Sequence, residues 1–276
     1  MSTPELETAV QQWLSYDPNP KTREEVKNLY DNKEYKVLAD HFLPRIAFGT
    51  AGLRSRMDWG YKNMNELVII QTTQGLGQYI LQTVPNCLDM GVAIGYDARH
   101  NSKTFAYIAT NVLLHLGFKV YLFNDIACTP HVPFAVTTKG CAAGIMVTAS
   151  HNPKFDNGYK VYWGNGVQII PPTDGGIADS IQKHLIPQTT YAFTLPTDNE
   201  RLIQGEVMEN IIEAYYQSIF KECHFVDNSK AQLQAVFTPM HGVGARFTER
   251  ALQTFGLPAY IPVVEQIQPD PEFPTV

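Results

Sequence analysis

The sequence has no long apolar run and no closely spaced cysteines. No run approaches the roughly 18 consecutive apolar residues that a membrane-spanning helix requires, so no membrane partner is expected. The N-terminus has neither the basic nor the apolar segment typical of a secretory signal. The cysteines form no CxxC pair, which disfavours a disulfide framework or a zinc site and favours reduced thiols and a cytoplasmic location. They are Cys87, Cys128, Cys141 and Cys223.

Positive charge is also scarce. The chain has 21 Lys and Arg residues against 27 Asp and Glu residues, a formal net charge of -6. A broad basic surface is therefore not expected, which argues against a nucleic-acid partner, although a few local cations could bind a small anion. With 44% hydrophobic residues, the 276-residue chain is long enough for one large domain or two smaller ones. The sequence does not indicate an oligomeric state.

Hydrophobic periodicity divides the chain into three parts. Residues 1–40 are polar and helical in pattern and are expected to form an N-terminal extension. Residues 41–204 alternate between buried strands and amphipathic helices. This order predicts an α/β fold with a mixed, mostly parallel sheet flanked by helices. Residues 205–276 begin a second α/β unit, which is expected to be incomplete.

Local signals predict several boundaries. An Asn-Gly pair at 165–166 predicts a hairpin, and the polar, proline-containing residues 186–206 predict a linker. Strands are predicted at residues 92–96, 120–123, 142–147, 159–162 and 167–170.

Helix signals are clearest at capping residues and prolines. Thr22 is predicted to lie at the start of a helix, and Ser102 is predicted to be an N-cap. Pro130 and Pro133 are expected to allow only a short helix start or turn. Gly75 and Gly77 lie within a predicted helix, where each glycine costs about 1 kcal/mol relative to alanine.

A loop rich in reactive side chains follows the strand at 142–147. Residues 148–153 read Thr-Ala-Ser-His-Asn-Pro, and residues 157–160 read Asn-Gly-Tyr-Lys. With Lys154, which lies between these two segments, the loop brings a serine, a histidine, an asparagine and two lysines to the end of a core strand. In open α/β sheets, ligands bind at the carboxyl ends of the strands.

This loop supports three interpretations. Ser150 could be a nucleophile activated by His151, although adjacent residues rarely face each other in a turn and the GxSxG motif is absent. The loop could be a structural turn, because Asn-Pro and Asn-Gly are common turn formers. In the third interpretation, Ser150 carries a phosphoryl group with roughly two negative charges, which nearby groups would bind. The candidate groups are Lys154, Lys160, Arg54, Arg99 and Asn152.

A second segment, residues 48–54, reads Phe-Gly-Thr-Ala-Gly-Leu-Arg. Its two glycines allow the backbone to approach a ligand or another strand closely. The guanidinium of Arg54, at the end of this segment, could bind a phosphate through two parallel hydrogen bonds.

Together, the two motifs resemble those of the α-D-phosphohexomutase superfamily. Residues 148–160 are similar to its phosphoserine loop, and residues 48–54 are similar to its N-terminal phosphate-contacting motif. Residues 71–75, Gln-Thr-Thr-Gln-Gly, and the tail 270–276, Asp-Pro-Glu-Phe-Pro-Thr-Val, are similar to the phosphopentomutase branch, the second phosphoglucomutase of animals. The resemblance covers about residues 40 to 276.

The resemblance implies a phosphoglucomutase or phosphopentomutase, an isomerase that interconverts sugar 1-phosphates with 6- or 5-phosphates through a bisphosphate. Phosphorylated Ser150 would transfer its phosphoryl group, and Arg54 would contact the phosphoserine region. Lys160 matches the family's candidate general acid/base, and His151 is a second candidate for that role. Small sugar phosphates are the expected partners, and glucose 1,6-bisphosphate or an equivalent is the expected activator. A base role requires the pKa of Lys160 to lie below the free value of about 10.4.

The resemblance also implies Mg²⁺, bound by one phosphate oxygen on Ser150 and by three aspartates. The family places these aspartates in a DxDxDR segment after the position of Val276. We therefore expect a parent mutase of which this chain is a truncated part, inactive or nearly so by itself. Two alternatives stay open: a glucose 1,6-bisphosphate synthase, and a non-catalytic isoform or fragment that binds partners or sugar phosphate without turnover.

Overall fold

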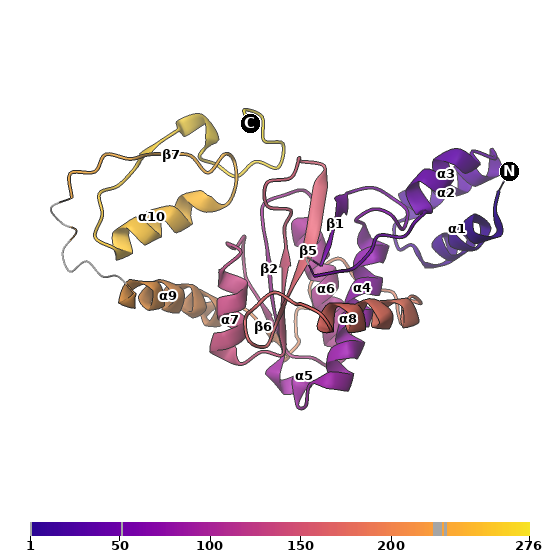
Figure 1. Ribbon diagram of the computed structural model, residues 1–276, viewed down its shortest axis with the longest axis horizontal. Coiled ribbons are helices and arrows are strands. Elements are labelled where there is room, and N and C mark those ends of the chain that lie inside the picture. The colour runs from indigo at the N-terminus through magenta and orange to yellow at the C-terminus, as the bar shows by residue number, and fades with distance from the viewer. Residues whose placement is uncertain (1, 51, 223–227, 229–230) are drawn as a thin grey trace.

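The computed structural model describes residues 2–50, 52–222, 228 and 231–276. In Figure 1 a six-stranded sheet stands at the centre, with three N-terminal helices on one side and a small unit containing two short strands on the other. The predicted α/β fold with a mixed, mostly parallel sheet is confirmed. The helices are α1 (Pro4–Tyr16), α2 (Pro20–Asp31), α3 (Tyr35–Phe42), α4 (Glu66–Thr83), α5 (Cys87–Met90), α6 (Ser102–His115), α7 (His131–Lys139), α8 (Thr173–Lys183), α9 (Glu206–Lys221), α10 (Gly244–Thr254) and the 3-10 helix η1 (Val264–Gln266). The strands are β1 (Leu53–Arg56), β2 (Val92–Tyr96), β3 (Val120–Leu122), β4 (Ala143–Val147), β5 (Asp156–Trp163), β6 (Leu202–Ile203), β7 (Val236–Phe237) and β8 (Ile261–Pro262).

The strand order in the central sheet is β1-β5-β4-β2-β3-β6. Strands β4, β2, β3 and β6 run parallel, whereas β5 and β1 pair antiparallel with their neighbours. The predicted strands at 92–96 and 142–147 are confirmed as β2 and β4, which are buried throughout. Because these strands are adjacent and parallel, the residues that follow them, Asp97 and Thr148, meet at the carboxyl ends of the strands.

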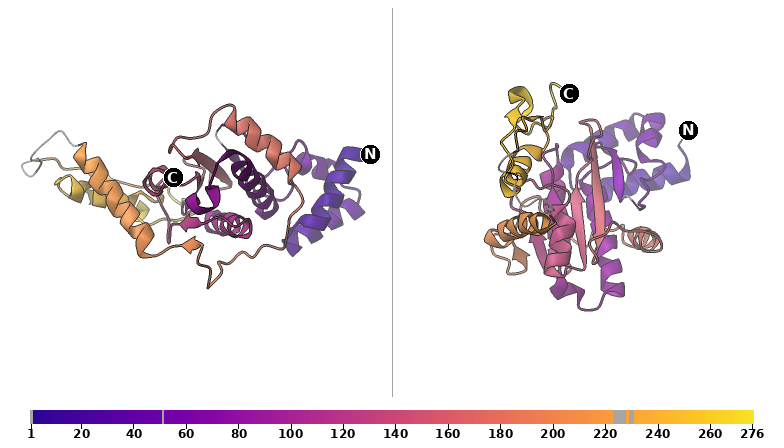
Figure 2. Two further views of the ribbon diagram at one scale, coloured as in Figure 1. Left: turned by 90° about the horizontal axis from the view of Figure 1, so that it is seen from below. Right: turned by 60° about the vertical axis from the view of Figure 1, so that its left-hand side comes forward.

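Helices cover both faces of the sheet (Figure 2). Val92 and Ile94 belong to one buried cluster with residues of α4 and α6, whereas the intervening Ala93 belongs to a second cluster with residues of α7 and α9, as the alternation of strand side chains requires. Gly75 in α4 has a packing reason, because a Cβ there would lie 2.4 Å from the Cα of Ile181 in α8. The cost of a glycine inside the helix is thus offset by close contact between α4 and α8.

The predicted helix start at Thr22 and the predicted cap at Ser102 are both wrong. Asn19 caps α2, so Thr22 lies inside the helix, where its hydroxyl donates to a carboxylate in the preceding turn. Asn101, with φ of 61°, precedes α6, which makes Ser102 its first residue and not its cap. The hydroxyl of Ser102 instead donates to Asp97 at 2.6 Å, so this serine is hydrogen-bonded to the residue that follows β2.

The prediction that Pro130 and Pro133 allow only a short helix start or turn is also wrong. Helix α7 has nine residues, and Pro133 is its third. The N–H groups of a first helical turn have no acceptor within the helix, so a proline there removes no hydrogen bond.

Residues 186–206 contain more than a linker. Leu202 and Ile203 form β6, which extends the parallel part of the sheet beside β3. A two-residue strand is too short to show the alternation of apolar and polar residues that marks a strand in the sequence. The hairpin prediction is confirmed only in part, because after β5 the chain turns back with a single bridge, between Tyr162 and Gln168, in place of a second strand.

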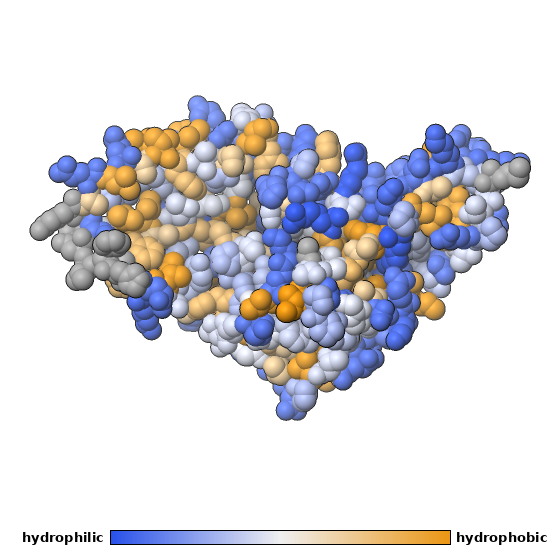
Figure 3. All heavy atoms as spheres, in the orientation of Figure 1, coloured by the Kyte–Doolittle hydropathy of each residue, from blue (hydrophilic) through white to orange (hydrophobic). Residues whose placement is uncertain are grey.

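The second unit contacts the central sheet through α9, whose Met208 and Ile211 are buried beside α7. Many of its other apolar side chains are exposed, and Figure 3 shows such residues gathered over β7 and α10. They include Leu233, Val236, Ile261 and Val264. This unit therefore buries less of its apolar surface than the central sheet does. The limits of the three predicted parts stay a prediction.

Within the described ranges, no helix combines the length and apolar character needed to cross a membrane. Cys87, Cys128 and Cys141 are free thiols. Cys223 and Ala51, which belongs to the glycine-containing segment 48–54, lie outside the residues that the structure describes.

Candidate active site

The chain leaves β4 and turns at Ser150, which is exposed. The φ angle of Ser150 is 54°, in the left-handed region that few residues other than glycine adopt. Its N–H donates to Oγ1 of Thr148 at 3.1 Å, and the hydroxyl of Thr148 donates to Asp97 at 2.7 Å. These two hydrogen bonds hold the strained turn and present Ser150 at the surface.

Lys160 reaches the same turn from β5. This strand pairs antiparallel with β4, so the chain returns beside the loop and places Lys160 opposite Met146. The Nζ of Lys160 donates to Oγ of Ser150 at 2.8 Å. Burial, and then the charge of Arg54, lower the pKa of Lys160 below its usual value, whereas Asp97 acts in the opposite direction. An amine in this position can exchange a proton with the hydroxyl.

Arg54 approaches the loop from β1, on the far side of β5. Its guanidinium donates to Oδ1 of Asn152 at 3.2 Å, which brings two of the predicted phosphate-binding residues together. Gly52, with φ of 78°, permits this approach, because a Cβ there would lie 1.9 Å from the carbonyl oxygen of Tyr159. The predicted close approach of the backbone is therefore confirmed at Gly52.

Arg99 holds the backbone of the loop, and the phosphate-binding role predicted for it stays a prediction. Its side chain is only 4% exposed. The guanidinium donates to the carbonyl oxygens of Pro153 at 2.9 Å, Ser150 at 2.9 Å and Asn152 at 2.7 Å. Its Nε lies 3.5 Å from a carboxylate oxygen of Asp97. With these donors engaged, Arg99 binds the backbone of the loop.

The Arg99→Met variant is expected to lose about 3–5 kcal/mol of unfolding free energy, because it leaves Asp97 and several loop carbonyl groups without their partner. Urea denaturation measures this loss. Arg201→Met is the control, since Arg201 pairs with Asp89 on the surface and its loss should cost less than about 1 kcal/mol. Equal, small losses in both variants would contradict the supporting role of Arg99.

The other two predicted residues, Lys154 and His151, have different surroundings. The Nζ of Lys154 lies 2.8 Å from Oε2 of Glu272, whose other oxygen lies 2.5 Å from Nε2 of His100. His151 is exposed. The side chain bonded to the hydroxyl of Ser150 is therefore Lys160, and this geometry disfavours an interpretation based on a serine–histidine pair.

A cavity of about 210 Å³ opens beside Ser150. Asp97 and Thr148 line it from the sheet, and His241 and Phe273 line it from the second unit. The guanidinium of Arg99 lies 5.1 Å from the centre of the Phe273 ring, so the tail of the chain packs on the loop. Sequence analysis missed Asp97, His241 and Phe273 as site residues. The one available signal was the position of Asp97 directly after a buried strand, like that of the Ser150 loop.

The described residues do not by themselves form a magnesium site. Within the ranges that the structure covers, no group of three His, Cys, Asp or Glu side chains could hold a metal ion. The carboxylates that contact the loop, Asp97 and Asp156, already accept hydrogen bonds from Thr148 and Asn152. No metal-dependent step is therefore assigned to these residues.

Comparison with family models gives two matches. Residues 45–186 match "Phosphoglucomutase/phosphomannomutase, alpha/beta/alpha domain I", and residues 213–276 match domain II of the same family. The matches follow the central sheet and the second unit in chain order.

Curated relatives match nearly the whole chain. A probable phosphoribomutase of Schizosaccharomyces pombe is 44% identical over 99% of the chain and 47% of its own length. The phosphopentomutase of Mus musculus is 42% identical over 98% of the chain and 45% of its own length. The glucose 1,6-bisphosphate synthase of Homo sapiens is 40% identical over 99% of the chain and 45% of its own length. The chain thus spans about half the length of these relatives.

Proposed function

Because the chain belongs to the phosphoglucomutase/phosphomannomutase family, within the phosphopentomutase branch of the α-D-phosphohexomutases, we propose that it takes part in mutase chemistry with Ser150 as the phosphoryl carrier. The observation that carries the proposal is the 2.8 Å contact between Nζ of Lys160 and Oγ of the exposed Ser150. In this reaction phosphorylated Ser150 converts a sugar 1-phosphate into a bisphosphate. The bisphosphate then returns its other phosphoryl group to Ser150 and leaves as the 5- or 6-phosphate.

The geometry around the hydroxyl supports each proposed role. When the bisphosphate returns a phosphoryl group, Oγ of Ser150 bonds to phosphorus while the bond from phosphorus to the sugar oxygen breaks. Lys160 takes the hydroxyl proton, and the sugar oxygen, which keeps the bonding electron pair, is protonated from solvent. In the opposite direction Lys160 returns the proton to Oγ. Arg54 supplies positive charge beside the loop, since phosphoryl transfer depends mainly on positioning and on charge stabilisation.

The remaining parts of the proposal concern the whole protein. Pentose and hexose phosphates are its proposed substrates, glucose 1,6-bisphosphate or an equivalent its activator, Mg²⁺ its metal and the cytoplasm its location. That the 276-residue chain alone turns over little or no sugar phosphate stays a prediction. It concerns repeated turnover, whereas the following test measures a single phosphorylation of Ser150.

Phosphoryl uptake by the chain tests the proposal directly. After incubation with glucose 1,6-bisphosphate, the intact mass should rise by about 80 Da, one phosphoryl group, and fragmentation should place that group on Ser150. A full-length phosphopentomutase treated in parallel is the positive control. A phosphoryl group on another residue, or none when the control is phosphorylated, would count against the proposal.

The second candidate is a glucose 1,6-bisphosphate synthase, favoured by the human relative of that name at 40% identity. Such an enzyme would draw its phosphoryl group from a glycolytic donor. If that donor phosphorylates Ser150 faster than glucose 1,6-bisphosphate does, the synthase is the better assignment.

A further inference from the structure

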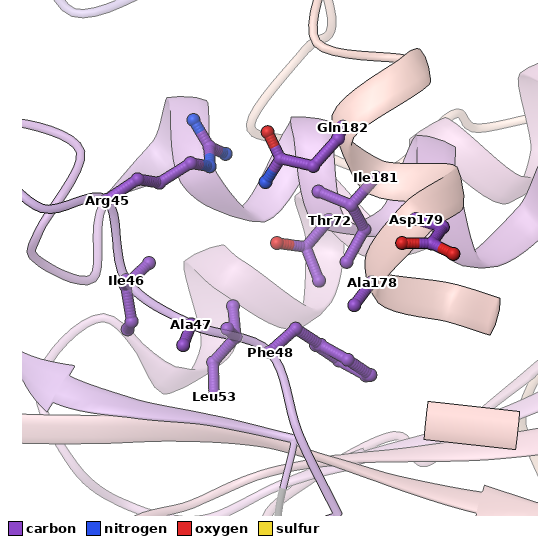
Figure 4. Close-up of a pocket in the computed structure, with 10 residues that line it drawn as sticks. All are labelled: Arg45, Ile46, Ala47, Phe48, Leu53, Thr72, Ala178, Asp179, Ile181 and Gln182. Carbon is purple, nitrogen blue, oxygen red and sulfur yellow. The ribbon is translucent and has the colours of Figure 1, made fainter. Parts of the chain in front are cut away.

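A second cavity lies on the side of the sheet covered by α4 and α8. It has a volume of about 280 Å³ (Figure 4). Its lining consists of residues 45–48, Leu53, Thr72 in α4, and Ala178, Asp179, Ile181 and Gln182 in α8. None of its lining residues lines the cavity beside Ser150. It is therefore separate from the candidate active site, and its use does not depend on phosphoryl transfer.

Arg45 supplies positive charge to this cavity without an anionic partner. Its guanidinium donates to Oε1 of Gln71 at 2.6 Å and lies 5.0 Å from the centre of the Tyr61 ring. It makes no ion pair with any residue that the structure describes. Burial lowers the pKa of Arg45 to about 10. A partly desolvated cation that makes no ion pair is stabilised when an anion binds.

The remaining walls define the rest of the ligand. Leu53 and Ile181, which are 2% and 3% exposed, form an apolar surface together with Phe48. Figure 4 shows the guanidinium of Arg45 and the amide of Gln182 at one end of the cavity and the carboxylate of Asp179 toward the other. The amide can donate to the same anion, whereas Asp179 would repel a second negative charge.

We propose that this cavity binds a small organic monoanion, with its carboxylate head at Arg45 and a compact apolar body against Phe48, Leu53 and Ile181. Such a ligand would bridge the segment that leads into β1 and the helix α8. These elements are already joined by the hydrogen bond from the hydroxyl of Thr50 to Asp174 at 2.8 Å.

The probe for this site is 3-phenylpropionate, titrated into the 276-residue chain and followed by amide chemical shifts. A ligand of about eleven non-hydrogen atoms should bind with a Kd of about 1–10 mM. The uncharged analogue 3-phenylpropan-1-ol should bind at least about tenfold more weakly, because it cannot form the charge-assisted bond to Arg45. Arg45→Gln should weaken the acid to a similar degree, whereas the surface variant Arg201→Gln should bind it as the unaltered chain does.

A second variant keeps the test valid if Arg45→Gln fails to fold, which its thermal unfolding would reveal. Ala178→Leu places a larger side chain in the cavity from α8, which reduces the space for a ligand, and leaves Arg45 in place. It should therefore also weaken binding at least about fivefold. The proposal is overturned if acid and alcohol bind equally, if Ala178→Leu leaves the affinity unchanged, or if the shifts centre on Thr148 and Ser150.

Discussion

Replacing Ser150 by alanine is expected to abolish phosphoryl uptake from glucose 1,6-bisphosphate, and with it any transfer to a sugar 1-phosphate. The change removes the hydroxyl that accepts a hydrogen bond from Nζ of Lys160. It leaves the backbone of the loop in place, because the contacts that hold that backbone come from Thr148 and Arg99. The intact mass should remain that of the unmodified protein, where the parent chain gains about 80 Da.

The matched control for this experiment is Ser55→Ala. Ser55 is a half-buried serine on β1 whose hydroxyl donates to the carbonyl oxygen of Lys62. This variant should gain the phosphoryl group as the parent does. Phosphorylation that persists in Ser150→Ala would mean that another residue, with His151 the first to examine, carries the group.

The strands nearest the site were predictable because they are buried on both faces. Residues 92–96 and 142–147 are unbroken apolar or small runs, and they form β2 and β4 with ends within one residue of those expected. Strand β6 lies at the edge of the sheet, and its two residues carry no period. Helix α7 was underestimated because Pro133 was treated as a break, although it occupies a first-turn position where the helix tolerates it.

The candidate site was predictable where its residues share one loop. Ser150 and Lys160 are ten positions apart, and the antiparallel pairing of β4 and β5 brings them together. The role of Arg99 could not be foreseen, because a cation that follows a strand can point to solvent or turn inward. Here Asp97, two residues before it, and the carbonyl groups of the loop hold it inward.

Contacts from the second unit were the least predictable part. Phe273 reaches the loop across more than a hundred residues of intervening chain, and only the packing of the two units decides that it meets Arg99. The pairing of Glu272 with Lys154 has the same origin. A sequence motif can mark the carrier of the phosphoryl group, but not the residues from elsewhere in the chain that enclose it.

Replacing Lys160 by methionine is expected to slow phosphorylation of Ser150 by about 10²–10⁴-fold, the usual contribution of a positioned acid–base group. The pH dependence follows from the lowered pKa of Lys160. The neutral amine is the base, so the rate of uptake should rise with pH, about tenfold per unit well below that pKa, and level off above it. Single-turnover rates with glucose 1,6-bisphosphate between about pH 7 and pH 10 measure both effects.

Lys160→Arg separates proton transfer from fixed charge. An arginine keeps the positive charge beside Oγ but does not release its proton in this pH range. If Lys160 acts as the base, the arginine variant should be nearly as slow as the methionine variant, and its rate should lose the rise with pH. If instead the arginine variant keeps most of the parent rate, or the parent rate falls as pH rises, then the charged form of Lys160 is the working form. The residue would then stabilise the phosphoryl group electrostatically, and the base would have to be found elsewhere.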